Sequence, residues 1–208
     1  MTEPAAEDLI RSLHIQTAQL DRLRAFEVLL RKWSSILNLV SPKAFSELWL
    51  RHILDSAQVQ RAQPDAKVWV DMGSGGGFPG IVTAILLADQ SASMVHLVES
   101  DQRKCAFLRT VSRETGLRTT IHNARIEHIS GELPAPDAVS ARALADMDTL
   151  IDWADPLLLR GAKGVFLKGK GVRAELTNLT RDSRFNIEIY PSISQPDGAI
   201  VKVGRAGL

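Results

Sequence analysis

An acid followed by a run of glycines marks the part of this chain that could hold a ligand. Residues 68–70 are apolar and typical of a strand, Asp71 ends that run, and five glycines follow between positions 73 and 80. An apolar stretch typical of a helix begins at Ile81. Glycines let the backbone turn sharply from strand to helix and leave it bare for a ligand. A purely structural turn would not need so many of them, so we expect a binding turn.

Two binding motifs overlap in this turn. Residues 75–80 match G-x-G-x-x-G, the dinucleotide fingerprint, and residues 71–77 match D-x-G-x-G-x-G, the first motif of class I S-adenosylmethionine methyltransferases. Asp71 would repel a pyrophosphate but suits the ammonium and sulfonium of S-adenosylmethionine, whose carboxylate could accept N–H groups of the glycines. We therefore favour the methyl donor as cofactor. An NAD(P)-dependent oxidoreductase is the alternative.

Three further positions follow predicted strands. Glu99 ends the second strand, where a carboxylate can accept hydrogen bonds from both ribose hydroxyls of either cofactor, although an acid favoured near a helix N-terminus is an alternative explanation. Ile126, after the third strand, could flank an adenine. Arg142 ends the fourth strand, and a buried cation is costly unless it is paired. We expect Arg142 to meet an acid or the substrate.

Polar residues outside the turn have two possible interpretations. His52, Asp55 and Ser56 share one face of a predicted helix, so they either contact the substrate or join the helix to the sheet through hydrogen bonds. Residues 160–184 carry seven Lys or Arg against two acids. Lys168, Lys170 and Arg173 in this segment are candidates for RNA phosphate contacts, which give salt-dependent affinity without sequence reading. The alternative is an ordinary solvated surface.

The composition is that of a globular protein without a membrane span. The net charge of the 208 residues is only +1, and the longest apolar run, residues 81–88, is far shorter than the roughly 20 residues a span needs. The acidic N-terminus lacks a signal core, and a single cysteine, Cys105, excludes an internal disulfide. We expect a cytoplasmic protein that is active as a monomer, with Cys105 in the core. No metal-ligand spacing is present, so we expect no metal.

The hydrophobic pattern divides the chain near residue 64. Before it, apolar residues recur at helical steps from Leu20 to Leu37, a break falls at residues 38–42 before Pro42, and a second helix is predicted at 44–61. We expect a helical cap over residues 1–64 and an S-adenosylmethionine-binding domain over residues 65–208.

Beyond residue 65, strands and helices alternate. The predicted strands are 67–71, 94–99, 118–122, 136–141, 162–168, 185–190 and 198–204, with helices at 79–89, 101–115, 124–129, 146–159 and 172–182. The last connection is too short for a crossover helix, so the final two strands should pair antiparallel. The pattern predicts a Rossmann-like α/β fold with a mostly parallel seven-stranded sheet and one antiparallel strand.

Taken together, these segments resemble the bacterial small-subunit ribosomal RNA guanine-N7 methyltransferase family (RsmG, also known as GidB). The resemblance rests on Trp33 with Asn-Leu-Val-Ser at 38–41, Arg-His-Ile-Leu-Asp-Ser at 51–56, the turn at 71–80, Arg-Ile-Glu at 125–127, Ser-Ala-Arg-Ala at 140–143 and Leu-Lys-Gly-Lys at 167–170. The family commonly has Asn-Leu-Thr-Ser in the first of these, which leaves the role of the cap open.

The resemblance implies a site and a reaction. The methyl donor would lie against the turn through Gly73, Gly75, Gly77 and Phe78, the pair of Ile126 and Glu127, and Arg142. The product would be guanine 527 of 16S ribosomal RNA methylated at N7. Because N7 carries a lone pair and no proton, no general base is needed and rate comes from positioning.

No residue is therefore assigned as catalytic, and Arg142, Lys168 and His52 are candidates for positioning. The partner would be 16S ribosomal RNA or the small ribosomal subunit. A non-catalytic ribosome- or RNA-binding module on the same fold is a second alternative.

Overall fold

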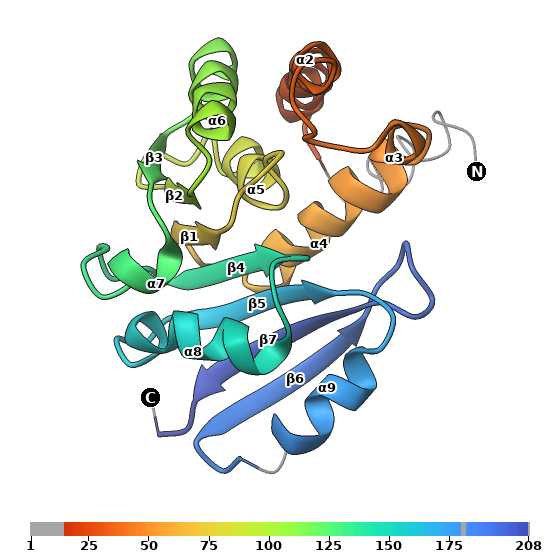
Figure 1. The fold of residues 1–208 in the computed structure, drawn as a ribbon. Coiled ribbons are helices and arrows are strands. Elements are labelled where there is room, and N and C mark those ends of the chain that lie inside the picture. Colours follow the sequence, from red (N-terminus) through yellow and green to blue (C-terminus); the bar gives the residue numbers. More distant parts are fainter. Residues whose placement is uncertain (1–14, 180–181, 208) are drawn as a thin grey trace.

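A seven-stranded sheet forms the centre of the computed structural model, which describes residues 15–179 and 182–207 (Figure 1). The strands are β1 Val68–Met72, β2 Met94–Glu99, β3 Thr119–Asn123, β4 Ala138–Arg142, β5 Lys163–Lys168, β6 Phe185–Pro191 and β7 Ala199–Arg205. Their order is β3-β2-β1-β4-β5-β7-β6, and only the pairings of β7, with β5 and with β6, are antiparallel. The predicted mixed sheet is confirmed, and each strand starts and ends within two residues of its prediction.

Helices cover both faces of the sheet (Figure 1). The helices are α2 Thr17–Ser34, α3 Pro42–Phe45, α4 Asp55–Ala62, α5 Gly80–Leu86, α6 Gln102–Thr115, α7 Ile126–Ile129, α8 Met147–Leu158 and α9 Val172–Leu179, with a π-helix, η1, at Leu48–Leu54. One core joins α2, η1, α4, α5 and α6 to the sheet, and a second lies under α7, α8 and α9. No helix in the described ranges is long and apolar enough to cross a membrane.

The helix predicted at 44–61 is wrong in its regularity, because the chain forms three pieces there. Its middle piece is the π-helix, in which Leu48, Trp49, Ile53 and Leu54 are all buried. A π-helix bonds residues five apart, so the pairs 48/53 and 49/54 fall on one face, which a regular α-helix would not allow. This wide turn also carries His52.

The N-terminal helices share their core with the sheet. Leu23 and Phe26 of α2 are fully buried in the same cluster as Trp69 of β1 and Ile81 of α5. The ring of Phe26 lies 5.2 Å from that of Phe78, centroid to centroid. The hydrophobic core therefore crosses the boundary that the pattern suggests near residue 64. The part of the predicted helical region before residue 15 lies outside the described residues.

The strand order brings the predicted site residues to one edge. Moving outward from the centre, β1 is followed by β2 and β3 on one side and by β4 and β5 on the other. The loops after β1 and β4 therefore leave the sheet in opposite directions and open a crevice at their carboxyl ends, the usual place for a ligand in an open α/β sheet. The glycine turn, Glu99 and Arg142 all end strands at this edge.

Candidate functional site

A cavity of about 410 Å³ opens at the carboxyl ends of β1, β2 and β4. This volume lies within the range of about 300–1,000 Å³ that small-molecule sites occupy. Most of the residues predicted from the sequence line it: His52, Gly73, Gly75, Phe78, Glu99, Ile126, Glu127 and Arg142. The tertiary structure thus brings together residues from a π-helix, three strand ends and a short helix.

The glycines of the turn serve two different purposes. A Cβ at Gly73 would lie 2.4 Å from Leu144 Cδ1, and one at Gly77 would lie 2.8 Å from Ile81 Cγ1, so both positions are filled by neighbouring side chains. A Cβ at Gly75 would meet nothing closer than a backbone oxygen at 3.6 Å. Of these three glycines, Gly75 alone has space for a Cβ. Gly77 packs against core side chains and does not line the cavity.

The N–H groups of the turn are largely engaged within the protein. Ser74 donates to the Val98 carbonyl at 3.0 Å, and Gly77 donates to the Ser74 carbonyl at 2.6 Å. Gly75 donates to Glu99 Oε2 at 2.9 Å. The expectation that the glycine N–H groups would bind a ligand carboxylate is therefore wrong for Gly75 and Gly77, because these groups hold the turn together.

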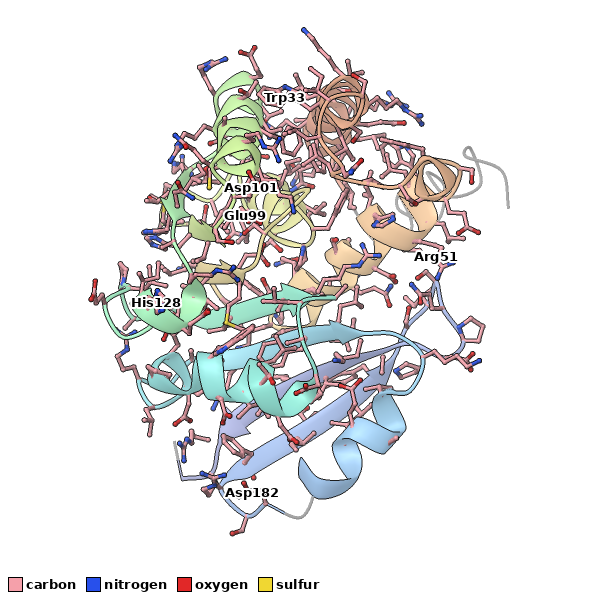
Figure 2. All side chains as sticks on the ribbon, in the orientation of Figure 1. Trp33, Arg51, Glu99, Asp101, His128 and Asp182 are labelled. Carbon is pink, nitrogen blue, oxygen red and sulfur yellow. The ribbon has the colours of Figure 1, made fainter. Side chains whose placement is uncertain are left out.

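Glu99 joins the glycine turn to the start of α6. Its Oε2 accepts the N–H of Gly75, and its Oε1 accepts the N–H of Asp101 at 2.8 Å (Figure 2 shows Glu99 and Asp101 side by side). The cap of α6 is Asp101, whose carboxylate accepts from the N–H groups of Arg103 and Lys104. Glu99 is thus not needed as the helix cap, and each of its oxygens retains acceptor capacity toward the cavity.

Asp71 lies beneath the turn and does not reach the cavity. It is fully buried, and its Oδ1 accepts a hydrogen bond from Ser140 Oγ at 2.7 Å. Its Oδ2 has no hydrogen-bond partner among the described residues and faces Gly80, where a Cβ would approach to 2.5 Å. Burial raises the pKa of Asp71 to about 6. The argument that Asp71 meets the positive end of a ligand is therefore wrong; this side chain ties β1 to β4.

Arg142 is paired with a histidine. Its Nη1 lies 2.6 Å from Nδ1 of His52. A guanidinium only donates, so Nδ1 accepts and the proton of the neutral imidazole is on Nε2. Burial, reinforced by the charges of Arg142 and Arg51, lowers the pKa of His52 to about 3. Burial also lowers the pKa of Arg142, and the charge of Asp55 opposes that shift. Of the two partners expected for Arg142, an acid or the substrate, the place of the acid is taken by a neutral ring.

Asp55 belongs to a hydrogen-bond network between α4 and the loop that joins β6 to β7. Asp55 is buried, and its carboxylate accepts from Ser192 Oγ at 3.0 Å and from Gln195 Nε2 at 3.2 Å. Ser56 Oγ donates to the carbonyl of His52 at 2.6 Å. Of the two interpretations of this helix face, hydrogen bonding between the helix and the sheet region applies to Asp55, whereas Ser56 bonds within its own helical segment and His52 lines the cavity.

The basic segment is largely engaged within the protein. Lys168 forms an ion pair with Glu175 at 2.6 Å, and its side chain is only 10% exposed. Arg160 donates to backbone carbonyls of residues 130 and 133. Lys170 is exposed. The side chain of Arg173 lies outside what the structure describes.

Comparison with known proteins identifies the family. The family model GidB, described as rRNA small subunit methyltransferase G, matches residues 19–196. The chain belongs to this family. The ribosomal RNA small subunit methyltransferase G of Parvibaculum lavamentivorans is 50% identical over 191 residues, which cover 91% of this chain and 84% of that protein. Its counterpart in Rhizobium meliloti is 41% identical over 199 residues, covering 94% and 93%.

Solved structures confirm the class I methyltransferase fold expected of a GidB protein. A putative O-methyltransferase from Klebsiella pneumoniae superimposes with a TM-score of 0.64 at 16% identity, covering 98% of this chain and 97% of that one. An SAH-bound methyltransferase from Podospora anserina gives a TM-score of 0.62 at 11% identity, covering 99% and 97%. At these identities the likeness shows the fold alone.

Several residues of this GidB cavity were not predicted from the sequence. They are Leu39, Val40, Ser74, Gly76, Val98, Ser100, Lys104, Ala124, Arg125, Ala143, Leu144 and Trp153. Lys104 and Trp153 lie in the helices predicted at 101–115 and 146–159, and neither position carries a sequence signal that points to a ligand. Leu39 and Val40 fall in the segment before Pro42 whose role the sequence left open.

The expected core position of Cys105 is confirmed. The residue is fully buried, its Sγ lies 3.2 Å from the Glu99 carbonyl, and burial raises the pKa of its thiol. Within residues 15–179 and 182–207, no group of three or more His, Cys, Asp or Glu is placed to hold a metal ion.

Proposed function

We propose that this chain transfers a methyl group from S-adenosylmethionine to N7 of a guanine in 16S ribosomal RNA, guanine 527 by resemblance to the family. The observation that carries the proposal is the buried carboxylate of Glu99, which is bonded to the glycine turn and lines the same cavity as Ile126. The relatives named as ribosomal RNA small subunit methyltransferases support the RNA as substrate.

The cavity suits the parts of this donor. The free acceptor positions of Glu99 would take the two ribose hydroxyls, as an acid at the end of a second strand does in such folds. Ile126 and Glu127 line the wall beside it and would flank the adenine. Since the N–H groups of Ser74, Gly75 and Gly77 are engaged, a cation that lines the cavity, Lys104 or Arg142, would bind the carboxylate of the methyl donor.

The residues at the site fit a reaction without a general base. When bound, S-adenosylmethionine would supply the methyl group as an electrophile on a positively charged sulfur, which keeps the electron pair of the broken bond. N7 of guanine has a free lone pair and loses no proton. His52 has its Nδ1 occupied by Arg142 and is not needed as a base. The protein's task is to hold the reactants in line and to exclude water. Phe78 and His52 both line the cavity, and their ring centroids lie 5.1 Å apart, so the two rings pack together in its wall.

The deciding experiment uses methyl-labelled S-adenosylmethionine with 16S ribosomal RNA and small subunits from cells that lack the protein. Label should enter the RNA, and cleavage chemistry specific for N7-methylguanine should map it to one guanine. Donor binding without transfer to either substrate would favour the RNA-binding module. Binding of NAD(P)H without binding of S-adenosylmethionine would favour an oxidoreductase.

A further inference from the structure

A second cavity, of about 280 Å³, lies beside the first at the carboxyl ends of β4 and β5. Arg142 and Ala143 line both cavities, so the two cavities adjoin at these residues. The other sides come from Asp55 of α4, from Glu175 of α9 and from the β6–β7 loop (Figure 1 shows α9 and this loop near the end of β5). A molecule in the second cavity would therefore lie next to one in the first.

The charges in this cavity are balanced and already paired. Two cations, Arg142 and Lys168, face two carboxylates, Asp55 and Glu175. Arg142 donates to His52, and Lys168 Nζ lies 2.6 Å from Glu175 Oε2 and 2.8 Å from the Ala145 carbonyl. A phosphate would meet both carboxylates, so this is a poor anion site. The walls suit a neutral ligand that carries both donors and acceptors.

Lys168 and Glu175 present a donor and an acceptor side by side. An ammonium has three N–H donors, and two of those of Lys168 are used by Glu175 and by the Ala145 carbonyl. Glu175 Oε2 also accepts the N–H of Met147 at 3.0 Å, which leaves Oε1 for a ligand. One N–H of Lys168 thus remains next to a carboxylate oxygen. The side chain of Lys168 is 10% exposed, so this donor is sheltered from water.

We propose that this second cavity receives the target guanine and that Lys168 and Glu175 read its identity. Guanine presents the O6 acceptor beside the N1–H and N2–H donors, which matches a donor beside an acceptor. Adenine has the reverse order, an amino donor beside the N1 acceptor, so it would leave both protein groups unpaired. This inference rests on the proposed function and assigns the base specificity to two residues.

Size, position and charge agree with this assignment. The volume lies just below the roughly 300 Å³ at which sites for drug-sized ligands begin, which suits one base turned out of an RNA stack. A purine with its Watson–Crick edge toward β5 and α9 has its N7 edge free to face the first cavity, where the two cavities meet beside Arg142 and Ala143. Methylation at N7 leaves the base positively charged, and the carboxylates of Asp55 and Glu175 favour that product.

The test pairs protein variants with RNA that carries a single changed base. The RNA contains guanine or 2-aminopurine at the methylated position; 2-aminopurine keeps N7 but lacks O6 and N1–H. For the full-length wild type, kcat/KM should be about 100-fold or more higher with the guanine RNA than with the 2-aminopurine RNA. Lys168→Met should slow methylation of the guanine RNA about 10- to 100-fold and methylation of the 2-aminopurine RNA much less. The discrimination between the two RNAs, which is the ratio of their kcat/KM values, should therefore fall. S-adenosylhomocysteine affinity should stay within about 2-fold.

Two further variants make the outcome decisive. Glu175→Gln keeps the shape of the pocket and should also reduce discrimination, even if Lys168→Met proves unstable. Lys170→Met, at the exposed neighbouring lysine, should leave discrimination unchanged. A purely structural role for Lys168 and Glu175 would slow both RNAs equally, which would overturn the inference while the proposed function stands. A wild type that methylates no RNA would overturn the proposed function itself.

Discussion

The guanidinium of Arg142 donates a hydrogen bond to Nδ1 of His52 across 2.6 Å, and this contact joins the end of β4 to the π-helical turn. Both side chains line the larger cavity, and Arg142 also lines the smaller one. A cation that would be costly to bury alone is thereby held in a defined position by a neutral acceptor. The position of the guanidinium that borders both cavities depends on this pair.

The low pKa of His52 makes stability depend on pH. In the folded protein the pKa is about 3, against about 6.5 in the unfolded chain, so the unfolded state binds more protons between these values. The contribution of the neutral His52 ring to the free energy of unfolding is present above pH 6.5 and is lost as the pH falls toward 3. Between pH 7 and pH 5, the wild type should lose about 2 kcal/mol more of its unfolding free energy than His52→Asn, which offers an acceptor without a titratable ring. Urea unfolding at both pH values measures this; equal losses would contradict it.

Gly75→Asp should prevent donor binding without unfolding the protein. Gly75 has a φ of +51°, a conformation that aspartate tolerates better than most residues, and a Cβ there has open space. The added carboxylate would occupy the cavity beside Glu99 and repel it. We expect S-adenosylhomocysteine affinity to fall more than about 100-fold by calorimetry, with unfolding free energy changed by about 1 kcal/mol. Gly116→Asp, at a φ of +66° with nothing near it, is the matched control.

Glu99→Gln should weaken donor binding through the ribose. The amide has one acceptor oxygen in place of two, so it cannot hold the N–H groups of Gly75 and Asp101 and both hydroxyls as well. A loss of about 10- to 100-fold in donor affinity is expected, as for hydrogen bonds to a charged group. The same exchange at the exposed Glu114 on α6 should have no effect on the affinity for the methyl donor. Unchanged affinity in Glu99→Gln would argue against the proposed orientation of the donor.

Salt dependence should separate the two lysines of the basic segment. Lys170 is exposed, whereas Lys168 is paired with Glu175 and largely buried. If Lys170 contacts a phosphate, Lys170→Ala should reduce the slope of log affinity against log salt by about 1. Lys168→Ala should leave the slope unchanged even where it slows methylation. Equal slopes for Lys170→Ala and wild type would show that this lysine is only solvated.

Pattern alone predicted the order of elements in the α/β region well. Most of the strands contain short apolar runs, and their placement depends on local sequence and periodicity. The division of the helix predicted at 44–61 into α3, η1 and α4 was not predicted from the pattern. This division allows Leu48, Trp49, Ile53 and Leu54 to be buried together in the core shared with the sheet. That requirement comes from packing partners far away in the chain.

Local motifs and the hydrophobic pattern of the sequence were enough to predict a ligand turn after β1, an acid at the end of β2 and a cation at the end of β4. The order that places β2 and β4 on either side of β1, and the groups that each charged side chain faces, became known from the tertiary structure. Asp71 lies under the turn, Arg142 meets His52, and Lys168 pairs with Glu175. Whether a charged side chain can bind a ligand depends on its burial and on its partners from distant segments. The spacing of residues along the chain predicts neither.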